Sequence, residues 1–360
     1  MNEKRKTVLV LFGGCSTEYS VSLQSAYAVL THIDESLYET VPVGIDHNGQ
    51  WYWYKGDIRA IPEDNWYRQE ADHPKLCIPV VVSPDKTLHR LLVMEETCII
   101  KKPVDAAFPV LHGKNGEDGT VQGVLELAGI PVVGCGTLCS AVGMDKEMAH
   151  RIVQAAGVRV PESVVLDAWP VEEEKMRAAA ALLNYPLFIK PVRSGSSFGI
   201  TKVACAEQLP SAIAGAFDYD DSVILEEAIE GFEVGCAILG NQKPVTGEVD
   251  EIELADGFFD YTEKYTLKTS AIHVPARISE EMTKKVKKTA VKIYRALKCR
   301  GFARVDLFLT GEGELVFNEI NTVPGMTVHS RYPQMMEKAG IPFEQVIGRL
   351  LSLSLGEGEG

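Results

Sequence analysis

The sequence predicts an α/β protein that begins with a parallel sheet. Two apolar runs of strand length, TVLVLF at 7–12 and TVPVGI at 40–45, flank a stretch at 21–30 in which apolar residues recur with helical spacing. This is the pattern of a βαβ unit, whose parallel strands are buried on both faces. Further buried strands are expected at 105–111 and 131–134. A chain of 360 residues is long enough for about two or three domains.

Beyond this opening, helices and strands alternate without a repeat of fixed period. The segment 49–102 is rich in Trp and Tyr and is interpreted as an insertion at the edge of the first sheet. A helix is expected over 145–156, and a strand at 223–229 ends the segment that follows it. A basic helix is expected over 280–297 and a hairpin over 302–322.

The composition is that of a folded protein with no general attraction to polyanions. Hydrophobic residues make up 46% of the chain and charged residues 24%, and 36 Lys+Arg against 50 Asp+Glu give a net charge of −14. No global field therefore draws the protein to nucleic acid or to an anionic membrane. The first apolar run is too short for a signal peptide, and the longest charge-free run, 127–144, is interrupted by glycines and Pro131. We expect a cytoplasmic protein that binds neither nucleic acid nor a membrane.

The eight cysteines are scattered along the chain. The one close pair, Cys135 and Cys139, has no second pair and no histidine near it in the sequence. This spacing predicts neither structural zinc nor a disulfide framework. Cys15, beside the first glycine turn, is interpreted as a small, half-buried side chain.

Residues 302–322 place four polar side chains on one face of an otherwise apolar hairpin. A turn centred on TGEGE pairs Asp306 with Glu319. The same register pairs Arg304 with Asn321. Because side chains two apart on a strand share a face, the four gather in one patch.

This patch predicts a magnesium site. Carboxylate and amide oxygens are ligands that suit Mg²⁺. The structural alternative is a buried salt bridge between Arg304 and Asp306 or Glu319. A register slip of one residue would separate the patch.

A second unusual segment is YPLFIKPVRSGSSFGITKV at 185–203. Lys190 closes an apolar strand, and RSGSSFG then offers backbone N–H groups and hydroxyls. A lysine beside such a loop is able to hold phosphate oxygens. The alternative is a glycine turn with a lysine that extends to solvent.

Three further features are weaker when taken alone. Glu18 and His112 each follow a predicted parallel strand, where ligands bind in open sheets. Taken alone, either residue is better explained as an ordinary cap or turn residue. The aromatic segment 257–270, which contains Lys264, is typical of a lid.

Seven motifs resemble those of the D-alanine:D-alanine ligase family of ATP-grasp enzymes and follow the same order along the chain. They resemble most of all the motifs of the family's D-alanine:D-serine ligases of vancomycin resistance. They are spread over nearly the whole chain: GGCSTEYSVSLQSA (13–26), HGKNGEDGTVQG (112–123), MDKEMAH (144–150), KPVRSGSSFG (190–199), FDYTEKY (259–265), RVDLF (304–308) and NEINTVPGMTVHSRYP (318–333). The resemblance implies a three-domain ATP-grasp architecture. Residues 1–143 would form an N-terminal α/β domain that binds the first D-alanine, 144–231 a central subdomain, and 232–355 a C-terminal subdomain with the lid and the metal site.

The resemblance also implies how ATP is bound, between the central and C-terminal subdomains. Lys146 and Lys190 would bind phosphates, and Lys264 would lie over the γ-phosphate. Glu226 and Ile229 would contact the adenosine, and Glu233 the ribose. The family's metal ligands correspond to Asp306, Glu319 and Asn321, which would hold two Mg²⁺ ions, or Mn²⁺ in their place.

The substrate-binding residues are implied in the same way. Glu18 would hold the ammonium group of the first D-alanine, and Ser196 and Tyr265 would bond with Glu18 to close the lid. His112 is expected near the substrate. Arg304 and the Gly325 backbone would stabilise the oxyanion, and Ser330 would bind the carboxylate of the second substrate.

The implied reaction forms an acyl phosphate from the first D-alanine, which the amine of the second substrate then attacks. The partners would be small D-amino acids, and a homodimer is expected from the resemblance. Two other classes compete: a different ATP-grasp activity, and a non-catalytic nucleotide-sensing module. The residues around Glu18 and Ser330 speak against the first, and the complete set of metal ligands against the second.

The second substrate is expected to be D-serine, with D-alanine as the alternative. Arg331 follows Ser330 at a position where many ligases that make D-alanyl-D-alanine carry an apolar residue. An arginine there can donate a hydrogen bond to the hydroxyl of D-serine. Alternatively, Arg331 supports the substrate carboxylate and leaves the two substrates nearly equal. D-lactate is disfavoured, because Lys264 and Tyr265 resemble the amino-acid-using enzymes.

Overall fold

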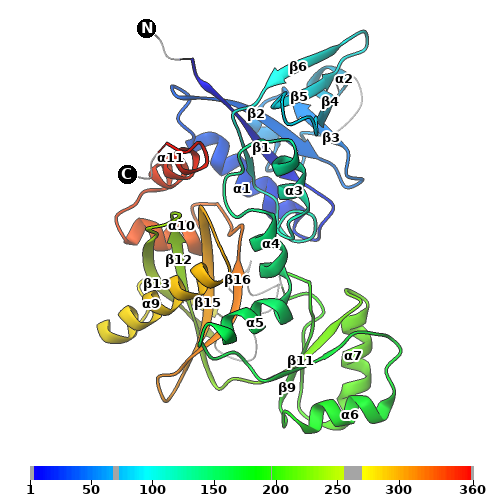
Figure 1. Cartoon of the computed structure of the whole chain (residues 1–360), viewed down its shortest axis with the longest axis vertical. Coiled ribbons are helices and arrows are strands. Elements are labelled where there is room, and N and C mark those ends of the chain that lie inside the picture. The colour runs from blue at the N-terminus through cyan, green and yellow to red at the C-terminus, as the bar shows by residue number, and fades with distance from the viewer. Residues whose placement is uncertain (1–3, 68–72, 196, 255–269, 358–360) are drawn as a thin grey trace.

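Three β-sheets and the helices around them make up the computed structural model, which describes residues 4–67, 73–195, 197–254 and 270–357 (Figure 1). The first sheet has seven strands in the order β6-β5-β4-β3-β2-β1-β7. Its parallel part is β1 (Lys6–Gly13), β2 (Tyr38–Ile45) and β7 (Ala106–Pro109), with α1 (Tyr19–His32) joining β1 to β2. The predicted βαβ opening is therefore confirmed.

The aromatic segment 49–102 extends the first sheet at one edge, as predicted. It adds the antiparallel strands β3 (Trp51–Tyr54), β4 (Cys77–Val82), β5 (Arg90–Met94) and β6 (Ile99–Pro103), with the short helices η1 (Ile58–Ala60) and α2 (His73–Leu76). The prediction of a strand at 131–134 is wrong, because this segment forms only one parallel bridge, between Ala107 and Val132. Gly134, with φ +111°, turns the chain away before a ladder forms.

The second sheet has four antiparallel strands in the order β10-β9-β11-β8. These are β8 (Ser163–Leu166), β9 (Leu187–Pro191), β10 (Thr201–Val203) and β11 (Val223–Glu227), with α6 (Glu173–Ala181), η2 (Ala206–Gln208) and α7 (Leu209–Phe217). Helix α7 packs on the strands, and α6 packs on α7. Apolar side chains of these helices and strands form a separate core.

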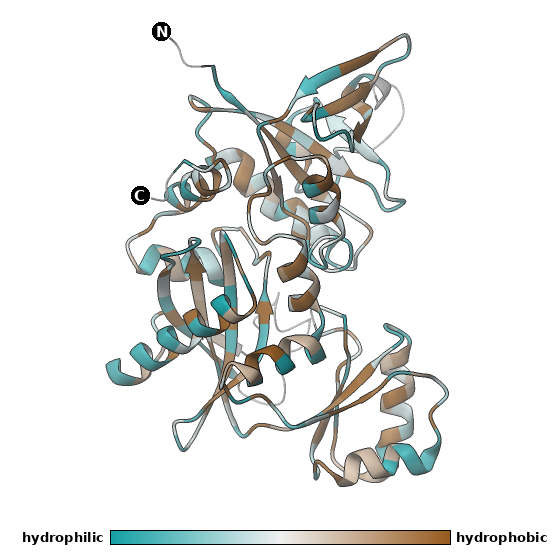
Figure 2. Cartoon of the chain, in the orientation of Figure 1, coloured by the Kyte–Doolittle hydropathy of each residue, from teal (hydrophilic) through white to brown (hydrophobic). Residues whose placement is uncertain are grey.

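The third sheet has five antiparallel strands in the order β14-β13-β12-β15-β16. These are β12 (Gly231–Leu239), β13 (Val245–Leu254), β14 (Ser270–His273), β15 (Phe302–Thr310) and β16 (Leu315–Asn321). Helices α9 (Glu280–Ala296) and α10 (Arg331–Lys338) pack on it, and α9 is largely hydrophilic along its length (Figure 2). Helices α3 (Thr120–Leu127), α4 (Thr137–Met144) and α5 (Lys146–Ala155) lead from the first sheet to the second. The predicted helix at 145–156 is confirmed as α5, which Asp145 caps by accepting the Met148 N–H at 2.9 Å.

The hairpin register is confirmed where the predicted patch requires it. Asp306 pairs with Glu319, and Arg304 pairs with Asn321. Toward the turn, Leu307 pairs with Phe317, so that Asn318 forms a bulge. The bulge lies beyond the two functional pairs and leaves their shared face intact.

The end of the chain completes the core of its beginning. Helix α11 (Phe343–Ser354) lies against α1 (Figure 1), and its buried residues belong to the same apolar cluster as Leu23 of α1 and Val10 of β1. Phe302 and Tyr332 extend this cluster toward the third sheet. The first and third sheets are therefore joined by continuous packing. Among the described residues, no helix combines the length and apolar character needed to cross a membrane.

Candidate active site

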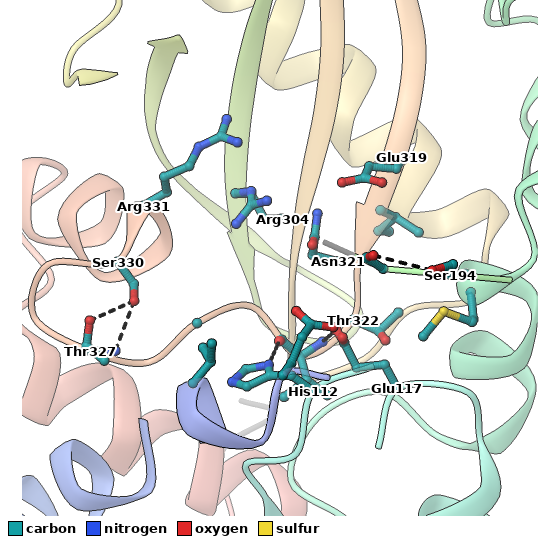
Figure 3. A pocket seen from close by; sticks show the side chains of 18 of the residues that line it. His112, Glu117, Ser194, Arg304, Glu319, Asn321, Thr322, Thr327, Ser330 and Arg331 are labelled. Carbon is teal, nitrogen blue, oxygen red and sulfur yellow. Dashed lines mark hydrogen bonds between the residues drawn. The ribbon is translucent and has the colours of Figure 1, made fainter. Parts of the chain in front are cut away.

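A cavity of about 630 Å³ lies where the first sheet, the β15–β16 hairpin and the loop after β9 meet (Figure 3). Of the residues predicted from the sequence, those lining it are Glu18, His112, Lys146, Arg304, Glu319, Asn321, Gly325, Ser330 and Arg331. They come from segments more than 300 residues apart in the chain. The remaining predicted residues with described positions do not line it: Lys190, Glu226, Ile229, Glu233 and Asp306. Ser196, Lys264 and Tyr265, together with the predicted lid segment, lie outside the described residues, except for Ser270 at its end.

The hairpin patch is an ion-pair network as well as a set of oxygen ligands. Arg304 donates to both oxygens of Asp306, at 2.8 Å from Nε and 2.7 Å from Nη2. Asn321 Nδ2 donates to Asp306 Oδ2 at 2.9 Å. Asp306 is 1% exposed and lies beneath the cavity, whereas Glu319 and Asn321 face it. The salt bridge considered as the structural alternative is therefore present together with the predicted patch.

Arg331 is the centre of a second buried network. Its Nε and Nη2 atoms donate to the two oxygens of Asp250 at 2.6 and 2.9 Å. Its Nη1 donates to Glu233 Oε1 at 2.8 Å, and Nη2 lies 3.3 Å from Asp306 Oδ1. In Figure 3 the guanidinium points away from Ser330. This geometry does not support the expected hydrogen bond from Arg331 to a substrate hydroxyl, because carboxylates of the protein accept from its nitrogens.

Asp250 is the partner that the sequence did not reveal. It is fully buried on β13, 81 residues before Arg331. No local spacing connects two residues so far apart, and only the packing of α10 on β13 brings them together. Glu233, expected at the ribose, lies in the same network.

Glu18 is enclosed by two glycines from different parts of the chain. A Cβ added at Gly113 would lie 2.8 Å from Glu18 Oε2, and one added at Gly195 would lie 2.9 Å from the same atom. Side chains at either position would therefore collide with the carboxylate. Gly195 precedes Ser196, so the loop predicted to act with Glu18 reaches it.

His112 ties the first sheet to the segment after the hairpin. Its Nδ1 lies 3.0 Å from the Val323 carbonyl, and its Nε2 lies 3.3 Å from Ser25 Oγ. Burial lowers the pKa of His112 and outweighs the opposite effect of the Glu18 carboxylate. The ring is therefore neutral at pH 7 and shapes the cavity wall.

Glu117 is a cavity residue that sequence reasoning missed. Its carboxylate accepts the Gly113 N–H at 2.9 Å and the Val323 N–H at 3.1 Å. Burial, and then the Glu18 carboxylate, raise the pKa of Glu117 to about 8. The residue lies in the HGKNGEDG segment, where the charged residues around it gave no reason to single it out.

The two lysines predicted to bind phosphate lie on adjoining elements. Lys146 Nζ, at the start of α5, donates to the Ser194 carbonyl at 2.7 Å. Lys190 Nζ, on β9, donates to Glu226 Oε2 on β11 at 2.5 Å. Burial alone would raise the pKa of Glu226, but the charges of Lys190, His150 and Lys146 and the hydrogen bond from Lys190 together lower it. Lys146 is therefore held at the segment 192–200 that joins β9 to β10, and Lys190 lies on β9 just before this segment.

Glu226 has an acceptor atom that the described residues leave unused. Its Oε1 is buried without a hydrogen bond, as is Nδ1 of the neighbouring His150, 3.7 Å away. Buried polar atoms without partners are rare and point to a missing ligand. A ligand with a donor, such as the exocyclic amine of adenine, fits this position.

Ser330 begins a helix whose first turn faces the cavity. It is the N-cap of α10 but makes no capping bond with its side chain. Its hydroxyl instead lies 2.8 Å from Thr327 Oγ1 and accepts the Thr327 N–H at 3.1 Å. A Cβ added at Gly325 would come within 2.9 Å of Ser330 Oγ, so glycine keeps this corner open. Helix N-termini favour anions, which suits a carboxylate.

Comparisons with known proteins agree with this architecture. Models of the N-terminal and C-terminal parts of D-Ala–D-Ala ligases match residues 7–135 and 152–352. The solved VanG D-Ala:D-Ser ligase from Enterococcus faecalis is 53% identical, with a TM-score of 0.89 over 98% of this chain and 100% of that one. The vancomycin B-type resistance protein VanB of Enterococcus faecalis is 44% identical over 97% of this chain and 98% of its own length. A putative D-alanine–D-lactate ligase of Streptomyces coelicolor is 44% identical over 98% of each.

The fold and the site thus define a ligase of the ATP-grasp class, in which ATP and a divalent metal are generally used. More narrowly, the chain belongs to the D-alanine:D-alanine ligase family. The second substrate differs among the relatives, as the names of the VanG and Streptomyces proteins state.

Proposed function

We propose that this protein is an ATP-dependent ligase that joins D-alanine to D-serine, giving a dipeptide for peptidoglycan precursors. The observation that carries the choice of D-serine is the 53% identity to the VanG D-Ala:D-Ser ligase, against 44% to the putative D-lactate ligase. Arg331 does not contribute to this choice, because its donors are directed at Asp250 and Glu233. D-Alanine as second substrate is the alternative, supported by the description of the matching family.

The adenosine and phosphate contacts are proposed as follows. Glu226 Oε1, which accepts no hydrogen bond from the described residues, would accept one from the adenine amine. Ile229 would pack beside the base and Glu233 would face the ribose. Lys146 and Lys190 would neutralise phosphate oxygens, with Lys264 over the γ-phosphate. The ion pair between Lys190 and Glu226 supports this assignment, since it holds a cation beside the proposed base site.

The hairpin would hold the metal through Asp306, Glu319 and Asn321. The donors are all oxygen atoms, as Mg²⁺ prefers, and when bound the metal would offset negative charge on the phosphates. We propose two ions, which Asp306, Glu319 and Asn321 would hold together. Asp306 already accepts from Arg304 and Asn321 and lies 3.3 Å from Arg331 Nη2, so binding a metal would require these contacts to rearrange.

The first D-alanine would bind with its ammonium group on Glu18. That carboxylate is 8% exposed and lies at the cavity, where a cationic group would compensate its charge. Ser196 and Tyr265 would complete this contact. His112, as a neutral ring, would form the wall behind it.

The second substrate would place its carboxylate on Ser330 and the first turn of α10. In the reaction, an oxygen of the D-alanine carboxylate attacks the γ-phosphorus and ADP leaves. The amine nitrogen of D-serine then attacks the acyl carbon, and phosphate leaves after the nitrogen loses a proton. Arg304 and the Gly325 N–H would stabilise the oxyanion between these steps.

The experiment that tests this class of activity is the release of phosphate from ATP with each amino acid alone and in combination. A ligase of this kind releases phosphate and forms a dipeptide only when D-alanine is present. Another ATP-grasp ligase would turn over with a different acid, and a nucleotide-sensing module would release none. We also propose a homodimer and the domain boundaries at 143/144 and 231/232, which sedimentation and limited proteolysis would test.

A further inference from the structure

Three buried cysteines from two distant parts of the sequence meet beside α4. Cys135 precedes α4, Cys139 lies in its first turn, and Cys299 follows the end of α9. Their three sulfur atoms all lie within 4.8 Å of one another, and those of Cys139 and Cys299 are 3.3 Å apart. The residues are 2%, 3% and 7% exposed. The sequence predicted no structural zinc because Cys299 stands 160 residues from Cys139.

Local backbone structure brings the third sulfur to the other two. Lys298 adopts φ +59°, which ends α9 and turns Cys299 inward. The N–H of Cys299 donates to the Tyr294 carbonyl at 3.0 Å and fixes that turn. Helix α4, which is mainly hydrophobic in Figure 2, presents Cys139 from the opposite side.

The distances between the three sulfur atoms match those expected around a single metal ion. Apolar packing alone does not require the sulfur atoms to lie so close together. Three sulfurs about 2.3 Å from a zinc ion lie about 3.8 to 4.0 Å from one another. The observed range, from 3.3 Å to at most 4.8 Å, brackets this value. A cysteine that serves only as a small apolar side chain has no reason to gather with two others.

Two helix ends border the cluster, one that favours an anion and one that favours a cation. Cys139 lies in the first turn of α4, where the helix dipole stabilises a negative charge. Cys299 follows the C-terminus of the 17-residue helix α9, where a cation is favoured. Hydrogen bonds from Cys139 and then Cys299 hold the pKa of Cys135 well below its usual value, whereas the pKa of Cys139 and that of Cys299 are raised.

We propose that Cys135, Cys139 and Cys299 form a binding site for a soft divalent cation, for which Zn²⁺ is the best fit. Thiolate ligands select such ions over Mg²⁺. Three thiolates with Zn²⁺ leave a buried charge of −1, whereas Cu⁺ would leave −2, which costs more in an apolar core. The carbonyl oxygens of Arg300 and Phe302, 3.4 and 3.6 Å from Cys135 Sγ, offer a donor for the fourth position. Binding forms three metal–sulfur bonds and releases the thiol protons to solvent.

The site would strengthen one wall of the cavity. Helix α4 ends at Met144, which lines the cavity beside Lys146. A metal that fixes α4 to the end of α9 would therefore stabilise the folded protein, since it binds the native state and not the separated cysteines. The role is structural and independent of the Mg²⁺ ions proposed at the hairpin.

The test uses the full-length protein, reduced with a phosphine, stripped with a chelator and kept in excess Mg²⁺ to occupy the hairpin. Zn²⁺ binding is measured by competition with a chromophoric chelator. We expect one tightly bound Zn²⁺ per chain and a rise in Tm on its addition. Cys299→Ala and Cys139→Ala should weaken binding by at least about 100-fold, since even outer-shell partners cost about 10- to 100-fold.

Cys236→Ala is the matched control, because Cys236 is equally buried in the same core but is not part of the cluster. It should bind Zn²⁺ as the unmodified protein does. If a cluster variant fails to fold, Co²⁺ added to the unmodified protein still gives an answer. Thiolate-to-cobalt charge-transfer absorption supports the site. Its absence, or equal Zn²⁺ retention by Cys299→Ala and the unmodified protein, overturns it.

Discussion

Glu319 is the residue on which the proposed metal site depends most directly, because it lies on the hairpin patch and faces the cavity. Replacing it with glutamine removes a charge and keeps the shape. We expect Glu319→Gln to lower kcat by at least about 100-fold, since a catalytic metal contributes several kcal/mol to charge stabilisation. Steady-state turnover at saturating Mg²⁺, with Tm as the check on folding, measures this.

Glu314→Gln is the matched control for that variant. Glu314 is on the same hairpin but at the turn, where it forms an exposed ion pair with Arg159. It should retain near-normal turnover. Normal turnover of Glu319→Gln as well would refute the metal assignment.

Arg331 is expected to matter for stability through the buried carboxylates that it neutralises. Arg331→Ala leaves Asp250 and Glu233 without their main partner. We expect the free energy of unfolding to fall by about 3 to 5 kcal/mol, as for other broken buried pairs. Arg59→Ala, which removes an exposed and solvent-screened pair with Asp57, should change it far less. If urea unfolding shows a similar loss of unfolding free energy for both variants, the buried ion pairs of Arg331 do not stabilise the protein as described.

The raised pKa of Glu117 leads us to expect that the stability of the protein depends on pH. Its pKa rises from 4.5 to about 8 on folding, so between these values the native state holds a proton that the unfolded state lacks. Stability from this group is present below about pH 4.5 and is lost as pH rises toward 8. Glu117→Gln removes this proton linkage. The unfolding free energy of the unmodified protein should therefore decline more steeply from pH 6 to 8 than that of the variant, and parallel curves would exclude the shift.

At the scale of elements, the hairpin was the most predictable part of the site. Its turn, its register and the face shared by Arg304, Asp306 and Asn321 follow from about twenty consecutive residues, where strand periodicity suffices. The ion pairs of Arg331 with Asp250, and the meeting of Cys299 with Cys139, were not predictable. They depend on how separate elements pack, and local periodicity contains no information on that.

Helix α11 should behave as part of the core that it shares with α1 and β1. Leu350 is 1% exposed in the apolar cluster that also contains residues of α1 and β1. We expect Leu350→Ala to lower the unfolding free energy by about 2 to 5 kcal/mol. Arg349→Ala, on the exposed side of the same helix, should change it by no more than about 0.5 kcal/mol. Equal effects in denaturant titrations would show that α11 is not docked as described.

At the scale of the whole molecule, the site exists only because the sheets are held together. Glu18 comes from the first sheet, Gly195 from the second and Arg304 from the third, and they border one cavity. The types of these residues were recognisable in the sequence through family motifs. The sequence did not show that the two ends of the chain share one core, because this core joins α11 to α1 across more than 300 residues.

Direct competition between second substrates tests whether the protein makes D-alanyl-D-serine. D-Serine and D-alanine are supplied together at neutral pH with ATP and Mg²⁺, and the two dipeptides are quantified. We expect a higher kcat/KM for D-serine as second substrate. A kcat/KM for D-alanine equal to or above that for D-serine would contradict it and assign the protein to the ligases that make D-alanyl-D-alanine.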